Sequence, residues 1–180
     1  MKRVSQMALI FCLLAAVPLV AALSTSVRIV INHELTTTAG LSTPEDIFRY
    51  SIAKRLSSGT GSAKCDQVLS ISRTIAAGSY DDIDLVGSET NPLNATVNMT
   101  RVRMLYLENT ATGTITVGNG PTAFEGWVSA SGTIELQVSG AVLLIAPTTG
   151  WIATDTVSDV LRLSSTDGSA FKLWAVGADE

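Results

Sequence analysis

Charge is scarce in this sequence. Only 16% of its residues are Asp, Glu, Lys or Arg, whereas about 25% is typical of a soluble domain. The basic residues are scattered and form no run longer than a pair such as Lys54-Arg55, and the formal net charge is −4. Proteins that bind DNA or RNA carry clustered positive charge. The sequence therefore predicts that nucleic acid is not a partner.

Cysteine and histidine are also rare, which limits the chemistry that the chain can perform. The two cysteines, Cys12 and Cys65, have no spacing typical of a disulfide framework, a metal site or a redox pair. We interpret both as buried or half-buried side chains without a chemical role. His33 is the single histidine, and His33-Glu34 lacks the second histidine of a zinc-protease HExxH motif. No GxSxG elbow is present, so we predict no catalytic residues, no cofactor and no metal.

Two other stretches resemble binding sites only superficially. The loop Gly59–Lys64 is rich in glycine, but it lacks the GxxxxGK[ST] spacing and the following helix of a phosphate-binding loop. Asp81, Asp82, Asp84 and Glu89 are residue types that ligate calcium. Asp82 and Asp84 lie on one face of the expected strand and Asp81 on the other, which favours a solvated face instead, whose charge discourages edge-to-edge pairing of sheets.

Sequons and aromatic residues complete the set of candidate sites. Asn94 and Asn98 begin formal N-glycosylation sequons, but such patterns arise by chance in a Thr-rich chain. The aromatic side chains of interest could stack on carbohydrate, although such residues more often anchor a core or an interface. They are Trp127, Trp151, Trp174, Tyr50, Tyr80 and Tyr106.

The N-terminus contains the one long apolar run, from Met7 to Leu23, preceded by Lys2 and Arg3. Val20-Ala21-Ala22 suits a signal peptidase site, and a run of this length lies at the lower edge of what spans a bilayer. Three interpretations stay open: a cleaved secretory signal, a retained anchor or packing arm, and a start codon assigned too early. We therefore separate a hydrophobic leader or arm over 1–23 from a single domain over 24–180, and expect membrane contact only if the leader is retained.

The rest of the chain reads as short strands. Apolar residues alternate with polar ones, as in Val27, Ile29 and Ile31, and turn-forming residues separate the runs. A turn is expected over 36–40, and although Thr43-Pro44 resembles a helix start, the period-two pattern favours a strand over 47–56. The spacing predicts an all-β fold, an antiparallel and jelly-roll-like β-sandwich of nine or ten strands. The other strands are expected over 68–75, 80–86, 96–107, 141–147, 159–165 and 169–176.

Three finer expectations concern the sandwich. The alternation over 96–107 changes phase near Arg101, as at a β-bulge or where a strand changes sheets. The run AVLLIAP at 141–147 is apolar on both faces, which predicts the central buried strand. Asp167-Gly168 is a strong hairpin signal and is expected to join strand 159–165 to strand 169–176.

Several of these segments together resemble a group of structural proteins of tailed bacteriophages. They are Ser58–Gly61 (SGTG), Arg73–Ala77 (RTIAA), Asp82–Leu85 (DIDL), Gly140–Pro147 (GAVLLIAP), Gly150-Trp151, Asp159–Leu163 (DVLRL) and Lys172–Gly177. The likeness covers nearly all of the chain from Ser24 to Gly177. It implies a small β-sandwich virion protein without catalytic residues.

The resemblance leads us to expect a non-enzymatic capsid-decoration or minor capsid protein that packs on the major subunits and forms homo-oligomers. Contacts are expected at the loops Ser57–Lys64 and Ser88–Asn94. The alternatives are a tail-associated virion protein and a secreted or surface-anchored binding module, for carbohydrate among other ligands. A hydrolase is disfavoured because His33 has no visible partner.

Overall fold

The structure is a computed structural model that describes residues 22–36, 45–127, 129 and 131–180. These residues contain fourteen β-strands and no helix, which confirms the predicted all-β, mainly antiparallel fold. Within them, no helix of the length and apolarity needed to cross a membrane is found. The predicted leader with Cys12 and the predicted turn after Thr36 lie outside the described residues.

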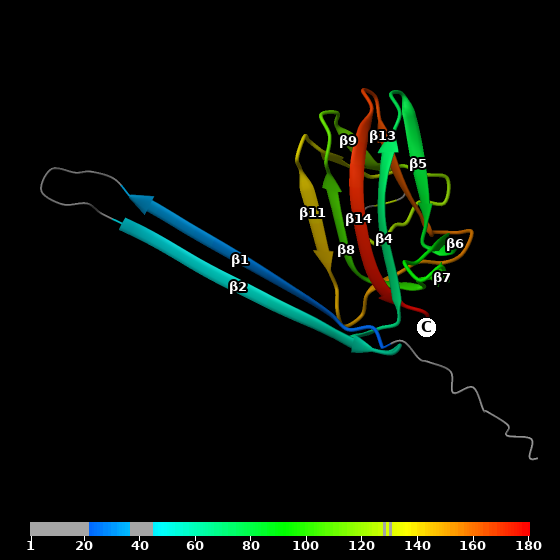
Figure 1. Cartoon of the computed structure of the whole chain (residues 1–180), viewed down its shortest axis with the longest axis horizontal. Helices are drawn as coiled ribbons and strands as arrows, with labels where there is room; N and C mark the ends of the chain where they lie inside the picture. The colour runs from blue at the N-terminus through cyan, green and yellow to red at the C-terminus, as the bar shows by residue number, and fades with distance from the viewer. Residues whose placement is uncertain (1–21, 37–44, 128, 130) are drawn as a thin grey trace, which may run out of the picture.

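Two sheets pack face to face to form the sandwich (Figure 1). The larger sheet has the order β11 (Ala141–Ile145), β8 (Arg101–Asn109), β14 (Ser169–Ala178) and β4 (Gln67–Ile75), and β12 (Trp151–Ile152) also pairs with β8. The smaller sheet has the order β10 (Thr133–Leu136), β9 (Ile115–Gly118), β13 (Val160–Ser165) and β5 (Ser79–Asp84). A short ribbon of β6 (Val86–Thr90) and β7 (Thr96–Asn98) lies beside them. The jelly-roll arrangement stays a prediction.

The main core fills the space between these two sheets. Alternate residues of each strand point inward, as the period of two requires. The buried members from the long strands include Leu69, Ile83, Leu105, Leu107, Ile115, Val117, Leu161, Leu163, Phe171 and Leu173. Their burial supplies the main stabilisation of the fold.

The first two long strands lie outside this sandwich. β1 (Thr25–Thr36) and β2 (Glu45–Ser58) pair antiparallel along their length, and the two-residue β3 (Lys64–Cys65) pairs with the end of β2. Figure 1 shows them as a two-stranded ribbon that projects from one end of the sandwich. We call this ribbon, made of Thr25–Thr36 and Glu45–Ser58, the arm. The single domain expected over 24–180 is thus a projecting arm followed by a sandwich.

The expectation that AVLLIAP forms the central strand was wrong. β11 is an edge strand that pairs with β8 alone, and its residues are half-buried or exposed. It is apolar on both faces because both faces of the sheet are covered near its end. Val142 and Leu144 pack on the main core, while Ile145 packs against a second cluster on the outer face.

The Asp167-Gly168 signal also gave the wrong pairing. The strands expected on either side of it exist, as β13 and β14, but they belong to different sheets. Ser165 and Ser169 are both buried, because the chain crosses from one side of the core to the other between them. Gly168 has φ +81°, a conformation that glycine adopts without strain. The turn residue was therefore correctly placed, but it forms an arch between sheets.

The phase change expected near Arg101 is present as a β-bulge at Arg103. The register of β8 against β14 shifts between the pairs Met104–Val176 and Val102–Gly177. Arg103 is therefore the extra residue of β8, with no residue of β14 directly opposite it. The expected strand over 96–107 is also divided into β7 and β8, which pair with different strands. Both consequences anticipated from the phase change are thus observed.

Candidate interaction surface

The arm is amphipathic across its two faces. Because residues that pair directly across two strands share a face, the register assigns the pairs Phe48–His33, Tyr50–Ile31 and Ile52–Ile29 to one side. We call this side the apolar face of the arm. The intervening pairs, among them Arg49–Asn32 and Ala53–Arg28, form the opposite side, which we call the polar face although Val30 and Ile47 are also exposed on it.

The apolar face has little cover within the chain. Ile31, Phe48 and Tyr50 are 50%, 52% and 48% exposed, and the rings of Phe48 and Tyr50 stack on each other with centroids 6.2 Å apart. A two-stranded hairpin in water is marginally stable unless a third element covers its apolar side. The arm is thus the element of the described structure that most clearly calls for a macromolecular partner.

The root of the arm is held by a small second core on the outer face of the larger sheet. Leu56, Cys65, Met104 and Val176 are fully buried there. Further residues pack around them: Leu23, Val27, Val68, Ile145 and Trp174. We call this set the root cluster. Leu56 and Val27 of this cluster lie on the apolar face at the root of the arm. Their packing fixes the arm to the sandwich.

The Cys65 thiol is part of this packing. Burial raises the pKa of Cys65 above its ordinary value of 9.0, and the hydrogen bond with Thr25 opposes this shift. The predicted buried cysteine is confirmed. A thiol held in its neutral form is a poor nucleophile and a poor metal ligand.

Arg103 locks the junction between arm and sandwich. Its side chain is 1% exposed, and the guanidinium donates hydrogen bonds to the carbonyl oxygens of Gly61 (2.7 Å), Thr148 (2.9 Å) and Pro147 (3.3 Å). It also forms an ion pair with Glu180. Because Gly61 belongs to the loop that follows the arm, one buried cation ties together the arm, the segment after β11 and the last residue.

The expected contact loop Ser57–Lys64 lies at this junction. Ser57 N–H donates to the Ala63 carbonyl (3.2 Å), and Ala63 N–H donates to the Pro147 carbonyl (3.0 Å). No helix follows the loop, since β3 and β4 come next. Its backbone therefore positions the arm, and its amides are not gathered around an anion.

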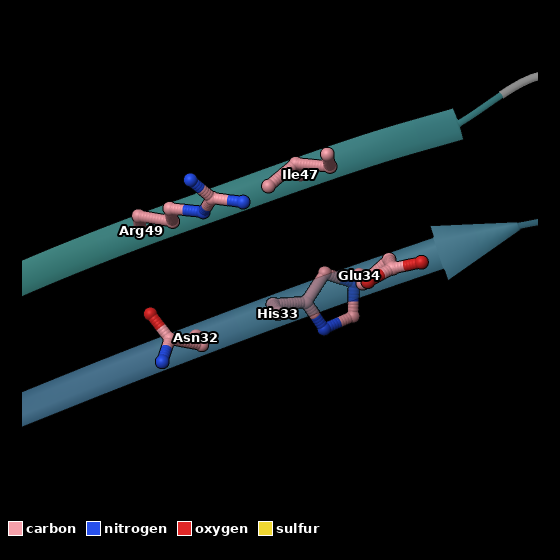
Figure 2. Close-up of a pocket in the computed structure, with 5 residues that line it drawn as sticks. All are labelled: Asn32, His33, Glu34, Ile47 and Arg49. Atoms are coloured by element: carbon pink, nitrogen blue, oxygen red, sulfur yellow. The ribbon is translucent and has the colours of Figure 1, made fainter.

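His33 lies far along the arm and is exposed. A shallow hollow of about 630 Å³ is lined by Asn32, His33, Glu34, Ile47 and Arg49. Figure 2 shows these residues spread along the two strands of the arm. His33 lies on the apolar face and the other four on the polar face, so the hollow gathers no catalytic pair on one side. Among the described residues, no serine, cysteine or carboxylate forms a hydrogen bond with His33.

The acidic residues around β5 are paired with arginines. Arg162 donates two hydrogen bonds to Asp82 (2.7 and 2.6 Å) and stacks 3.9 Å above the Tyr80 ring. Arg73 binds Glu89 (2.5 Å) and Asp81 (3.3 Å), and the bond to Glu89 raises the pKa of Arg73.

The fourth carboxylate, Asp84, accepts a hydrogen bond from the Val86 N–H (2.7 Å). Within the described residues, no group of three His, Cys, Asp or Glu side chains is placed to hold a metal ion. β5 is an edge strand of its sheet, so these ion pairs line an edge as the sequence suggested.

The six aromatic residues do not form one platform. Trp127 and Trp151 pack on the main core, and Trp174 packs on the root cluster. Tyr50 lies on the arm and Tyr80 on β5, whereas Tyr106 pairs directly with Trp174 across β8 and β14. This last pair places two of the six side by side on the outer face of the larger sheet.

The remaining sequence candidates lie near the end of the sandwich at which the arm begins. Asn94 occupies a turn with φ +60°, and Asn98 is half-buried in β7. In the second expected contact loop, Ser88–Asn94, the Asn91 side chain accepts hydrogen bonds from the N–H groups of Leu93 (2.9 Å) and Ala95 (3.0 Å). Leu93 is 75% exposed and lines a small hollow with Leu23 and Val68.

Two functional features were missed from the sequence: the exposure of the apolar face of the arm and the locking role of Arg103. The alternation over residues 47–56 is longer than the about 5–6 residues of an average strand, which is a signal for a long strand but not for its exposure. A lone arginine inside the apolar run VRMLYL was another, because buried arginines require partners. The chain matches no protein-family model and no curated protein.

Proposed function

We propose that this chain is a non-enzymatic structural protein of a tailed-phage virion, a capsid-decoration or minor capsid component that packs on the major subunits. The observation that carries the proposal is the arm. It extends a stacked pair of aromatic rings and several aliphatic side chains away from a sandwich that already has its own core. An exposed apolar surface of this kind is typical of a protein–protein contact.

The locked junction supports the same proposal. A buried arginine and a closed loop at the root fix the direction of the arm, and binding by a pre-oriented element loses less conformational entropy. The resemblance of residues 24–177 to tailed-phage structural proteins supports the virion as the setting. Self-association into homo-oligomers is part of the proposal, since repeated contacts build symmetric assemblies.

The test is to purify particles that carry this gene and to measure the chain by quantitative mass spectrometry. We expect a fixed copy number per particle that survives washing in high salt. The double variant Phe48→Ser/Tyr50→Ser is expected to be lost from the particles. The matched polar-face variant Arg49→Ser/Ser51→Ala is expected to stay bound. Absence of the wild-type chain from washed particles would refute the proposal.

The apolar run before Ser24 favours one alternative, a secreted or surface-anchored binding module. N-terminal sequencing of chain recovered outside the producing cells separates the two. A mature chain that begins near Leu23, together with no particle-bound chain, would favour the alternative.

A further inference from the structure

The outer face of the larger sheet, which points away from the main core, changes character along its length. The cross-strand registers of β11, β8, β14 and β4 define three successive rows on this face. From the arm outward they are Ile145–Met104–Val176–Val68, then Leu143–Tyr106–Trp174–Ser70, then Ala141–Glu108–Lys172–Ser72. The first row is apolar, the second aromatic and the third polar.

The first row belongs to the root cluster, and the second row meets this cluster through Trp174. Met104 and Val176 are fully buried beneath the arm. In the second row Leu143, Tyr106 and Trp174 are half-buried and Ser70 is exposed. Because the serines of β4 are small, a shallow cavity of about 430 Å³ remains beside the rings of Tyr106 and Trp174.

We infer that the apolar face of the arm of one copy packs on the second row of a neighbouring copy, at Leu143, Tyr106 and Trp174. The inference rests on the self-association that is part of the proposed function, and it names a second copy of this chain, and not a major capsid subunit, as the partner of the apolar face of the arm. Each copy then donates one arm and receives another.

The contact inside each chain supports this pairing. At the root, Leu56 and Val27 already pack against the first row of the same sheet face. The second row continues this surface without a break. The chain's own arm leaves the sandwich at that end (Figure 1), so the second row is left for an arm from elsewhere.

The aromatic residues on the two surfaces are suited to each other. The stacked rings of Phe48 and Tyr50 on the arm would meet Tyr106 and Trp174, which pair across β8 and β14. Aromatic pairs in offset or edge-to-face contact stabilise an interface beyond the area that they bury. Such residues are the common anchors of protein–protein contacts.

The formal charges of the two regions favour a contact between an arm and a sandwich over a contact between two arms. Residues 59–180 contain six lysines and arginines against thirteen aspartates and glutamates, a formal charge of −7. Residues 25–58 contain four against three, a formal charge of +1. Two arms packed face to face would instead bring two copies of Lys54, which lies on the apolar face, into one interface.

The contact is heterologous, because the donating and receiving surfaces differ. Contacts of this type close into rings or extend as open arrays, depending on the rotation between copies. A decoration layer is one such array.

Site-specific cross-linking of the full chain tests the inference. A Cys12→Ser background leaves only the buried Cys65. Chains with His33→Cys, which keeps both rings and places the thiol beside Phe48 on the apolar face, are mixed with chains that carry Ser70→Cys and treated with a short bis-maleimide. We expect a cross-linked species that contains one chain of each kind. The matched control replaces His33→Cys by Asn32→Cys, which presents the thiol on the polar face, and is expected to cross-link far less.

Each other outcome would overturn the inference. Cross-linking of His33→Cys chains with one another would indicate arm-to-arm packing. A further sample is a single chain that carries both His33→Cys and Ser70→Cys. If this chain cross-links only within itself, the arm folds back on its own sandwich. Absence of any cross-link while the chain stays on washed particles would refute the contact between copies and leave the proposed function intact.

A second measurement is needed because a cross-linker can also join chains that collide by chance. Sedimentation of the full chain over a concentration series is expected to show self-association. Phe48→Ser is expected to weaken this association at least about tenfold, the effect of losing one buried aromatic side chain. Arg49→Ser is expected to leave it unchanged, and equal weakening by both variants would contradict the assignment of faces.

Discussion

The arm and the sandwich use the same alternation of apolar and polar residues with opposite results. Phe171 on β14 is fully buried between two sheets, whereas Phe48 on β2 is 52% exposed. Both side chains lie on long, well-paired strands. The difference shows that alternation determines which side of a strand is apolar, while a separate element has to cover that side.

Stability is therefore expected to be uneven. Burial of a phenylalanine side chain contributes about 1.5–3 kcal/mol, and the sandwich gains such contributions from both of its sheets. Among the described residues of the arm, such burial is found at its root, where Leu56 is buried. Four experiments test this contrast, beginning with the largest expected effect.

Hydrogen exchange compares the backbones of the two regions directly. In dilute monomer, amides of the central strands β8 and β14 are expected to exchange at least about 1,000-fold more slowly than amides in the outer half of the arm. The outer arm opens without disturbing the main core, whereas the central strands open only with global unfolding. Exchange read by mass spectrometry or NMR measures this ratio. Similar protection in the two regions of a monomer would contradict the comparison.

Truncation of one phenylalanine in each region separates the two energetically. Phe171→Ala is expected to lower the free energy of unfolding by about 3–5 kcal/mol, because it leaves a cavity in the core. Phe48→Ala is expected to change it by less than about 0.5 kcal/mol in the monomer, as for an exposed site. Urea denaturation at low protein concentration measures both. Equal losses would mean that the arm is covered within its own chain.

Arg103 joins the two regions, so its replacement should affect both. Arg103→Met is expected to cost about 3 kcal/mol, because the partners of a buried cation are left uncompensated. Arg101→Met is the matched control, since Arg101 is 33% exposed and pairs with the same Glu180. An exposed pair contributes about 0–1 kcal/mol. Chemical denaturation gives the costs, and the spread of spin-label distances between arm and sandwich should broaden for Arg103→Met alone.

Cys65 gives the smallest effect, at the boundary between the regions. Its pKa is raised by burial in the folded chain, so the unfolded chain ionises first as the pH rises. The stabilisation is fully present below the ordinary pKa of 9.0 and is lost as the pH rises through the folded value. We expect the free energy of unfolding to fall more steeply above pH 9 for the wild type than for Cys65→Ala. Parallel curves would show that the thiol is not desolvated.

The sequence predicted strands better than it predicted their partners. The pattern around Ile29 and Phe48 identified strands, and the phase change identified the bulge at Arg103. Partners depend on contacts between residues far apart in the chain, which periodicity does not encode. For that reason the apolar run containing Leu143 was assigned to the centre of the sheet when it forms an edge, and Gly168 was assigned to a hairpin when it forms an arch.

The exposure of the apolar face of the arm could not be predicted from the sequence for a related reason. An alternating strand that packs on its own core and one that packs on another molecule have the same pattern, so Tyr50 and Ile31 gave no sign of their exposure. The pairing of Asp82 with Arg162 was equally invisible, because these residues are separated by 80 positions. Negative inferences, such as the missing second histidine near His33, needed only local sequence.

The pairing pattern also has a consequence for how the chain folds. In the sandwich, Ser169 pairs with Ile75, 94 positions earlier, whereas at the outer end of the arm Thr36 pairs with Glu45, only 9 positions later. Loop closure costs entropy that grows with separation, and folds dominated by distant pairs form slowly. The arm can therefore close within microseconds, as hairpins do, long before the sheets that anchor it. The part of this protein that forms first is thus the part least able to persist alone, and it becomes permanent only once another surface covers it.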